Sequence, residues 1–221
     1  ASALNDVDAL ITALEQLIAK KRNIKQGAMQ QLLTGKKRLP GFSGEWEVKT
    51  LENITTEIGD GIHSTPQYIL YSDFFFVNGN NLIDNSIKIT DNTMCVSEIE
   101  YNRHKKKLNL LTILLSINGT IGNIAFFNDE KIILGKSAAY ININNSVSRS
   151  FIFYLLQSSS IKNYFEDELT GSTIRNLSLK TIRNTPILLP AFPEQQAIAQ
   201  ILSDMDTEIE SLKQKRNKYK A

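Results

Sequence analysis

The same amphipathic pattern begins this chain and ends it. Leu4-Asn5-Asp6-Val7-Asp8 near the N-terminus matches Leu202-Ser203-Asp204-Met205-Asp206 near the C-terminus. In both segments the apolar positions that follow are mostly three and four residues apart: Leu4, Val7, Ile11, Leu14 and Ile18 in the first, and Leu202, Met205, Ile209, Leu212 and, past a polar Arg216, Tyr219 in the second. Such stripes are the contact surfaces of helices that pack at a coiled-coil angle. They predict helices that pair with each other or with a second copy; two unrelated amphipathic helices are the alternative.

Composition limits what lies between these helices. With 221 residues, 42% of them hydrophobic, the chain can bury one sizeable core and leaves room for one appendage. A formal net charge of +2 is only mildly basic, so any affinity for nucleic acid must come from local clusters of charge. Cys95 is the single cysteine, which excludes an intrachain disulfide and favours a cytoplasmic protein. The apolar run 108–117 is too short to span a bilayer, so we expect no membrane association.

The residue composition and the spacing of apolar residues change along the sequence and suggest three parts. We assign residues 1–35 to a long N-terminal helix that ends at Thr34-Gly35, residues 36–190 to a globular body, and residues 191–221 to a C-terminal helix that Pro193 opens. Because the chain starts at Ala1, already inside the helical pattern, we expect it to be part of something longer.

Short apolar runs punctuated by Gly, Asn and Asp predict a compact mixed sheet in the body. The runs are residues 68–71, 74–77, 112–117 and 124–127. Residues 150–165 predict one helix, whose buried face would hold Phe151, Tyr154, Leu155 and Ile161. The fold class is therefore α+β, a compact mixed-sheet domain flanked by two long helices. Since both helices join the same body, we expect them to pack antiparallel.

No catalytic pattern is evident. His63 and His104 have no cysteine or second histidine at the spacing of metal ligands, and no Walker-type phosphate loop or Asn-Pro-Pro-Tyr motif is present. We therefore expect no catalytic residues, no metal and no cofactor in this chain.

Loops rich in Gly, Ser, Thr and Asn are the first candidates for ligand contact. The segment 59–68 concentrates turn formers and hydrogen-bonding side chains, of which we select His63, Ser64, Thr65 and Gln67. Two further loops, 118–122 and 170–178, present hydroxyls and backbone N–H groups suited to phosphates and base edges. From them we select Asn118, Thr120, Ser172, Thr173 and Arg175. Ordinary turns have the same composition and remain the alternative.

The second candidate is a basic run. Tyr101-Asn102-Arg103-His104-Lys105-Lys106-Lys107 is the strongest in the body, and we select Arg103, Lys105, Lys106 and Lys107 as phosphate contacts. A solvated charged face is the alternative interpretation.

The order of these motifs resembles that of a type I restriction-modification specificity subunit, specifically one target-recognition half. The motifs are Gln30-Gln31-Leu32-Leu33-Thr34-Gly35-Lys36, Leu39-Pro40-Gly41-Phe42 leading to Trp46, Asp60-Gly61-Ile62-His63-Ser64-Thr65-Pro66, Asn118-Gly119-Thr120-Ile121-Gly122, the segment Gly171 to Ser178, and Leu189-Pro190 with Pro193-Glu194-Gln195-Gln196.

The resemblance implies a function. In this family two recognition domains, separated by long antiparallel helices, each read one half of a split DNA site, and the helices dock methyltransferase subunits. It implies a non-catalytic chain that recognises double-stranded DNA and directs methyltransferase subunits and, through the complex, restriction (translocase and nuclease) subunits. Because this chain has one recognition body, we expect two copies to associate. A coiled-coil scaffold whose body binds protein is the alternative function.

Overall fold

The computed structural model describes residues 2–171 and 175–220. Their contacts divide the chain into two units. The helical unit comprises residues 1–46 and 190–221, and the globular unit comprises residues 47–189.

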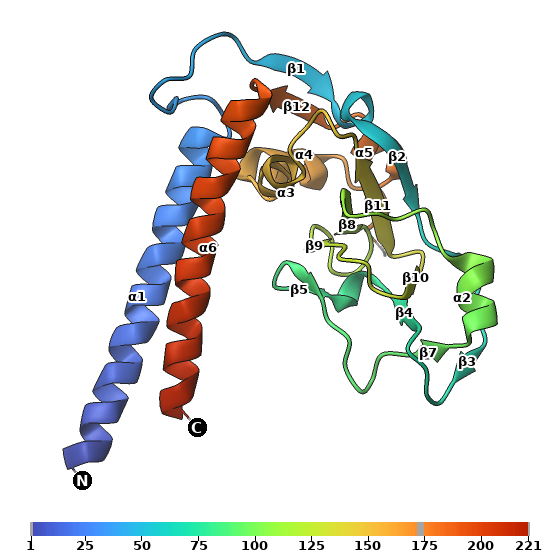
Figure 1. The fold of residues 1–221 in the computed structure, drawn as a ribbon, viewed down its shortest axis with the longest axis horizontal. Coiled ribbons are helices and arrows are strands. Elements are labelled where there is room, and N and C mark those ends of the chain that lie inside the picture. The colour runs from blue at the N-terminus through green and yellow to red at the C-terminus, as the bar shows by residue number, and fades with distance from the viewer. Residues whose placement is uncertain (1, 172–174, 221) are drawn as a thin grey trace. The chain divides into compact units, whose positions relative to one another are not determined.

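Two long antiparallel helices form the helical unit (Figure 1). They are α1 (Ser2–Leu32) and α6 (Phe192–Lys220). Two ion pairs show that the helices run in opposite directions. Lys25 lies 2.6 Å from Asp206, whereas Glu15, earlier in α1, lies 2.7 Å from Lys220, later in α6. The expected antiparallel packing is thereby confirmed.

The predicted stripes form the contact between these helices over part of their length. Leu14, Ile18, Leu202 and Ile209 are at most 6% exposed. Val7, Ile11, Met205 and Leu212 are half-buried, and the side chain of Leu4 lies outside the described part of the structure. Tyr219 is 43% exposed, so the stripe was wrong there, in the last turn of α6.

The chain between α1 and the globular unit belongs with the helices. Arg38 forms a two-bonded ion pair with Glu194, from Nε to Oε1 at 2.6 Å and from Nη2 to Oε2 at 2.7 Å. Trp46 Nε1 donates to the same Oε2 at 3.2 Å. From sequence we placed residues 36–46 with the globular body. In the structure they instead contact the start of α6. Their partners are about 150 residues away in the chain, so no local sequence pattern reveals these contacts.

The globular unit is built from short strands and helices. Its strands are β1 (Glu47–Thr50), β2 (Thr55–Asp60), β3 (Tyr68–Ile69), β4 (Phe75–Val77), β5 (Leu82–Ile83), β6 (Ser86–Ile87), β7 (Cys95–Val96), β8 (Thr112–Ser116), β9 (Ile124–Phe126), β10 (Ile132–Leu134), β11 (Ala138–Ile143) and β12 (Pro186–Leu189). Its helices are η1 (Leu51–Ile54), η2 (Gly79–Asn81), α2 (Glu98–His104), α3 (Arg149–Leu156), α4 (Ser159–Asp167) and α5 (Leu179–Arg183).

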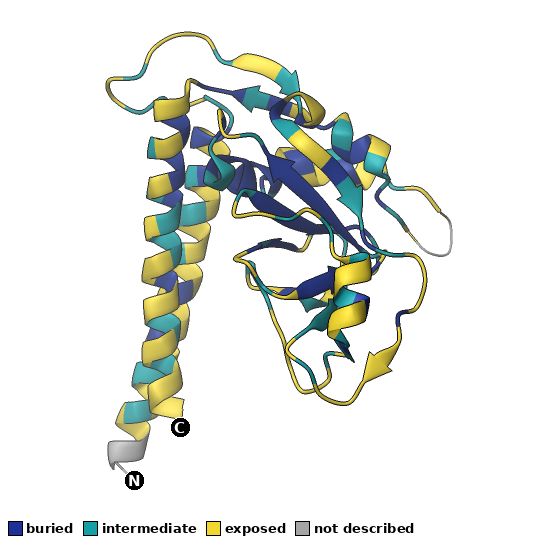
Figure 2. Cartoon of the chain, turned by 45° about the vertical axis from the view of Figure 1, so that its right-hand side comes forward, coloured by how far each residue is buried: buried dark blue, intermediate teal, exposed yellow. Residues whose placement is uncertain are grey.

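A four-stranded antiparallel sheet of order β2-β11-β8-β9 forms the centre of this unit. All residues of β8 and β11 are buried, which Figure 2 shows in dark blue. The second four-stranded sheet has the order β10-β4-β7-β3, and β1-β12 and β5-β6 are two-stranded. A mixed-sheet unit together with two long terminal helices confirms the α+β class.

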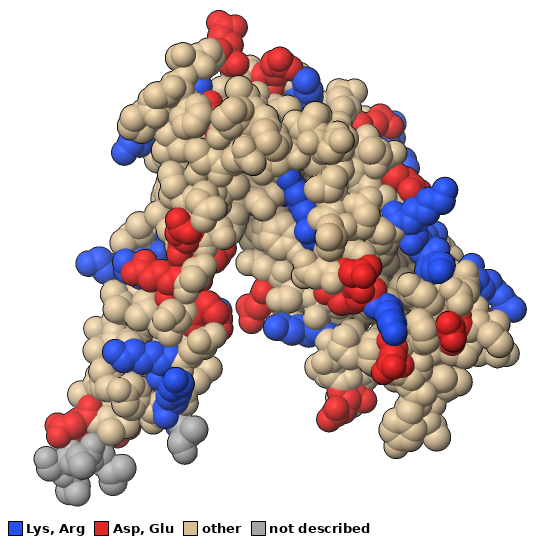
Figure 3. Space-filling view, viewed as in Figure 1, with Lys and Arg blue, Asp and Glu red and all other residues tan. Residues whose placement is uncertain are grey.

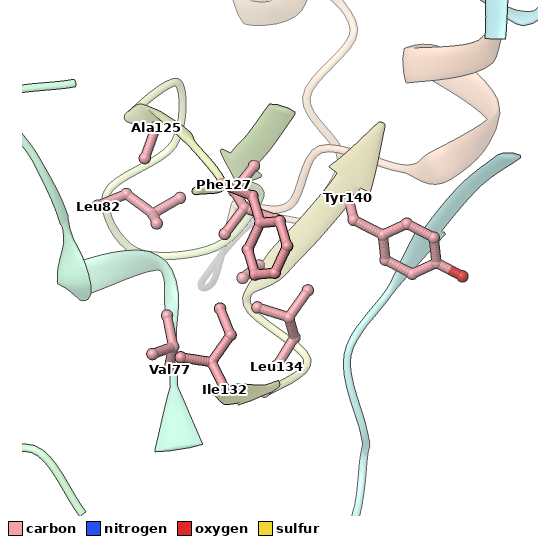
Figure 4. Packing of buried hydrophobic residues seen from close by; sticks show 9 residues of the cluster. Val77, Leu82, Ala125, Phe127, Ile132, Leu134 and Tyr140 are labelled. Atoms are coloured by element: carbon pink, nitrogen blue, oxygen red, sulfur yellow. The ribbon is translucent and has the colours of Figure 1, made fainter. Parts of the chain in front are cut away.

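Apolar side chains pack on both faces of the central sheet. On one face, residues from β8, β9 and β11 join others from β4, β5 and β10 around Phe127 (Figure 4). The cluster contains Val77, Leu82, Leu114, Ala125, Phe127, Ile132, Leu134, Ala138 and Tyr140. On the other face lies α3, whose Phe153 ring stacks on Phe126 of β9 at 3.8 Å between centroids. Alternation along the strands supplies apolar residues to both faces.

Two local expectations need correction. Residues 150–165 form two helices, α3 and α4, because Ser158 accepts a hydrogen bond from the backbone N–H of Ile161 and caps a new helix. The expected buried face of Phe151, Tyr154, Leu155 and Ile161 is confirmed, since all four are at most 5% exposed. The expected strand 68–71 ends at Ile69, leaving Leu70 and Tyr71 almost fully exposed.

Candidate nucleic-acid interface

The register of the central sheet brings three loops to one of its ends. Asp60 at the end of β2 pairs with Ala139, and Ser116 at the end of β8 pairs with Ala138, while β9 begins beside Leu115. Loops 61–67, 117–123 and 135–137 therefore all leave the sheet at the same end. We call this the loop end of the sheet.

Backbone hydrogen bonds fix these loops to one another. Ile62 N–H donates to the carbonyl of Leu134 at 2.7 Å, and Ile117 N–H donates to the carbonyl of Ser137 at 2.9 Å. The turn 135–137 thus lies between the other two loops, and it carries the exposed Lys136. Leu177 N–H donates to the carbonyl of Ile117 at 3.0 Å, which adds the end of the segment 170–177 to the same cluster.

Exposed polar groups from the first loop lie at this end. His63, Ser64, Thr65 and Gln67 are all exposed, and His63 Nε2 lies 2.9 Å from Oδ2 of Asp60. The backbone N–H of Gln67 donates to Glu100 of α2 at 3.4 Å. The loop is therefore held at both ends while its side chains remain accessible.

The second and third candidate loops meet in a shallow hollow. Asn118 pairs with Asn176 in an isolated bridge, and the Thr120 hydroxyl lies 3.0 Å from that of the buried Ser116. The hollow has a volume of 550 Å³ and is lined by residues 119–121 on one side and by Glu166, Leu169 and Arg175 on the other. Arg175 is bound to Glu166 at 2.8 Å. Ser172 and Thr173, which we also selected, lie outside the described residues.

The basic run does not lie with the three loops at the loop end of the sheet. Arg103 lies on α2, where it pairs with the buried Glu100 at 2.7 Å, and Lys105 ends the helix. The carbonyl of Lys107 accepts a hydrogen bond from Asn142, which pairs with Thr112 at the opposite end of the central sheet. The run 105–107 therefore leads from the end of α2 to the opposite end of the central sheet. Basic side chains gather in Figure 3 where α2 lies.

Acidic partners were missed from sequence. Glu100, only 6% exposed, holds Gln67 and Arg103 together, and Glu166 engages Arg175. The signal for α2 was present: Ser97 and Glu100 have the Ser-x-x-Glu spacing of a capping box, and Ser97 caps the helix. No comparable signal existed for Glu166, whose partner depends on tertiary folding.

A buried tyrosine supports β2 beneath the first loop. The Tyr140 hydroxyl donates to Glu57 Oε1 at 2.6 Å. Burial, and then this hydrogen bond to Glu57, raise the pKa of Tyr140 above its usual range. Tyr140 therefore remains a protonated donor, and its contact with Glu57 holds β2 against β11.

Neither a metal site nor a membrane span is found in the part of the chain that the structure describes. Its residues contain no group of three or more His, Cys, Asp or Glu side chains that could hold a metal ion. Within the same residues, no helix has the length and apolar character needed to cross a bilayer.

Comparison with known proteins places the chain among DNA specificity proteins. Residues 43–221 match the family model described as the type I restriction modification DNA specificity domain. The chain is 27% identical over 232 residues to the type I restriction enzyme MjaVIII specificity subunit of Methanocaldococcus jannaschii, a match covering 95% of this chain and 53% of that protein. It is 28% identical over 229 residues to the putative MjaX specificity subunit of the same organism, covering 95% and 50%.

Solved structures agree in fold. The type I restriction-modification S subunit from M. genitalium matches with a TM-score of 0.67 and 17% identity, covering 99% of this chain and 56% of that one. The HsdS subunit from Thermoanaerobacter tengcongensis matches with a TM-score of 0.61 and 19% identity, covering 96% and 51%. The chain spans about half the length of the curated relatives that it matches.

Proposed function

Because this chain belongs to the type I restriction-modification DNA specificity family, we propose that its globular unit reads one half of a split site in double-stranded DNA. The observation that carries this proposal is the sheet register, which gathers loops 61–67, 117–123 and 135–137 at one end. Exposed hydroxyl, amide and imidazole groups on such loops suit base edges.

We propose that basic residues supply affinity and the loops supply sequence choice. Lys105, Lys106 and Lys107 lie outside the loop end, so they would bind phosphates of the duplex that flanks the half-site. His63, Ser64 and Gln67 would instead decide which base pairs are preferred.

Replacing Lys105, Lys106 and Lys107 together by glutamine should weaken binding to all DNA sequences equally. If each contacts a phosphate, the slope of log affinity against log salt should shrink by roughly 0.9 per lost contact. Binding is measured over a salt series, with a triple Lys20, Lys215 and Lys218 variant of the helical unit as the charge-matched control. An unchanged slope would show that the three lysines do not contact DNA. If the parent chain binds no duplex at any salt concentration, a protein-binding scaffold is favoured instead.

The chemistry would come from other subunits. We propose that this chain is non-catalytic, holds no cofactor, and directs methyltransferase subunits docked on α1 and α6 and, through the complex, restriction subunits. This assembly would act on DNA in the cytoplasm. Support comes from the relatives' names, which are those of specificity subunits of restriction enzymes. Methyl transfer from S-adenosylmethionine by the purified chain alone would contradict the proposal.

Two copies of the chain would complete the split site. The chain spans about half of its curated relatives, and its two helices begin with matching sequences. A second copy can supply a second recognition unit through a two-fold contact, and two-fold symmetry requires inverted half-sites in the DNA. Selection from random duplexes with the methyltransferase subunit present should return inverted repeats with a fixed gap. A chain that stays monomeric at micromolar concentration, or selected sites without inverted symmetry, would contradict this arrangement.

A further inference from the structure

The ring of His63 is oriented by the central sheet. Its Nε2 lies 2.9 Å from Oδ2 of Asp60, the last residue of β2, which is paired with Ala139 of β11. The side chain of Asp60 is 24% exposed, whereas that of His63 is 72% exposed. A rigid carboxylate therefore holds one edge of an accessible imidazole.

The backbone between these two residues is also fixed. Gly61 N–H donates to the carbonyl of Ala138 at 3.2 Å, and Ile62 N–H to that of Leu134 at 2.7 Å. The position of the ring is thus set by two strands and one turn rather than by a free loop.

The chemistry of the pair determines what the other ring nitrogen can do. An ionised carboxylate only accepts hydrogen bonds, so the ring nitrogen facing Asp60 must carry the proton. In a neutral imidazole the second nitrogen is then an acceptor. Nδ1 of His63 makes no hydrogen bond to any described residue, so its lone pair is available to a ligand.

We propose that Asp60 is a positioning residue that fixes the tautomer of His63, so that Nδ1 accepts a hydrogen bond from the exocyclic amino group of a DNA base. The inference rests on the proposed function and names the group that this site reads. Such amino groups are N6 of adenine and N4 of cytosine in the major groove, and N2 of guanine in the minor groove. Thymine has none.

The first experiment locates the base. The full chain with its methyltransferase subunit selects sites from random duplexes, and the selection is repeated with His63→Ala. We expect one base-pair position to lose its preference. Every base pair has an amino group on one of its bases, so this experiment locates the pair and the base analogues decide which amino group is read. No change at any position while binding stays sequence-specific overturns the inference but leaves the proposed function standing. Absence of sequence-specific binding by the parent chain overturns the proposed function itself.

Base analogues then test the hydrogen bond. Replacing adenine by purine or cytosine by 2-pyrimidinone removes the amino group in the major groove, and replacing guanine by inosine removes the one in the minor groove. We expect about tenfold weaker binding by the parent chain, within the range for one base contact, and no change in the His63→Ala variant. Equal binding to both duplexes by the parent chain would overturn the inference.

Asp60→Asn tests the positioning role. An amide can accept from or donate to Nε2, so both tautomers become possible and Nδ1 can also donate. The preference should relax toward bases that present an acceptor at the same place, while the stability of the protein is retained. Asp91→Asn removes an equal charge from an exposed position of the same unit and controls for general electrostatics. A preference ratio that is unchanged in Asp60→Asn, or changed equally by Asp91→Asn, would contradict the role of Asp60.

Discussion

Replacing Glu194 by alanine is expected to lower the free energy of unfolding of the helical unit by about 3–5 kcal/mol. Glu194 is 1% exposed and accepts two hydrogen bonds from Arg38 and one from Trp46. Its removal leaves the Arg38 guanidinium, whose side chain is only 28% exposed, without its carboxylate. Because the carboxylate is buried and the guanidinium only half-buried, the cost should exceed that of an ion pair whose carboxylate is exposed.

The chain contains its own probe for this measurement. Trp46 is the only tryptophan and lies in the contact, so its fluorescence in a urea titration reports on the helical unit. Glu208→Ala is the control, because its carboxylate is 49% exposed, whereas its partner Lys21, at 32%, is about as exposed as Arg38. This pair should be worth less than about 1 kcal/mol. Equal losses for the two variants would show that the Glu194 cluster contributes no more than a surface ion pair.

Gly61→Val is expected to cost about 3 kcal/mol, at the upper end for overpacking, and to abolish sequence preference. A Cβ atom at Gly61 would overlap the carbonyl groups of Leu134 and Gly135. These are backbone atoms of β10 and the turn after it, so no flexible side chain can move aside. Loop 61–67 would have to leave its place beside the turn 135–137.

Unfolding of the globular unit, followed by circular dichroism in urea, measures the first effect, and selection from random duplexes measures the second. Gly119→Ala is the control that separates steric overlap from backbone strain. A Cβ atom at residue 119 would meet nothing within 4 Å, but the φ of +71° favours glycine. This variant should therefore cost about 1 kcal/mol. A Gly61 variant as stable and as selective as the parent would mean that the loop adapts freely.

Sequence reasoning succeeded where structure depends on neighbours along the chain. The helices α1 and α6 follow from apolar stripes that repeat every three to four residues, and the buried face of α3 and α4 follows from the same periodicity. The prediction of one helix over residues 150–165 failed at Ser158. A serine within a helical pattern can be tolerated inside a helix, and nothing in the pattern showed that this one caps a new helix.

The candidate site was predictable only in part. The polar loops and the basic run were visible as composition, but their distribution over the two ends of the sheet depends on strand register, which pairs Asp60 with Ala139 across the fold. The ion pair of Arg38 and Glu194 joins residues 156 positions apart and has no sequence signature. By contrast, Asp60 and His63 are only three residues apart, so their pairing can be considered from sequence alone, although the sequence indicates no nucleophile for it to activate.

The globular unit begins and ends on adjacent strands, since Glu47 of β1 pairs with Leu189 of β12. Antiparallel partners are about 5 Å apart, so the segment between them is a closed insertion whose ends barely separate. Any other domain that starts and finishes on such a strand pair fits the same junction, and α1 and α6 keep their own packing. Exchange of residues 47–189 would therefore replace the whole globular unit while the residues through which α1 and α6 pack on each other stay the same.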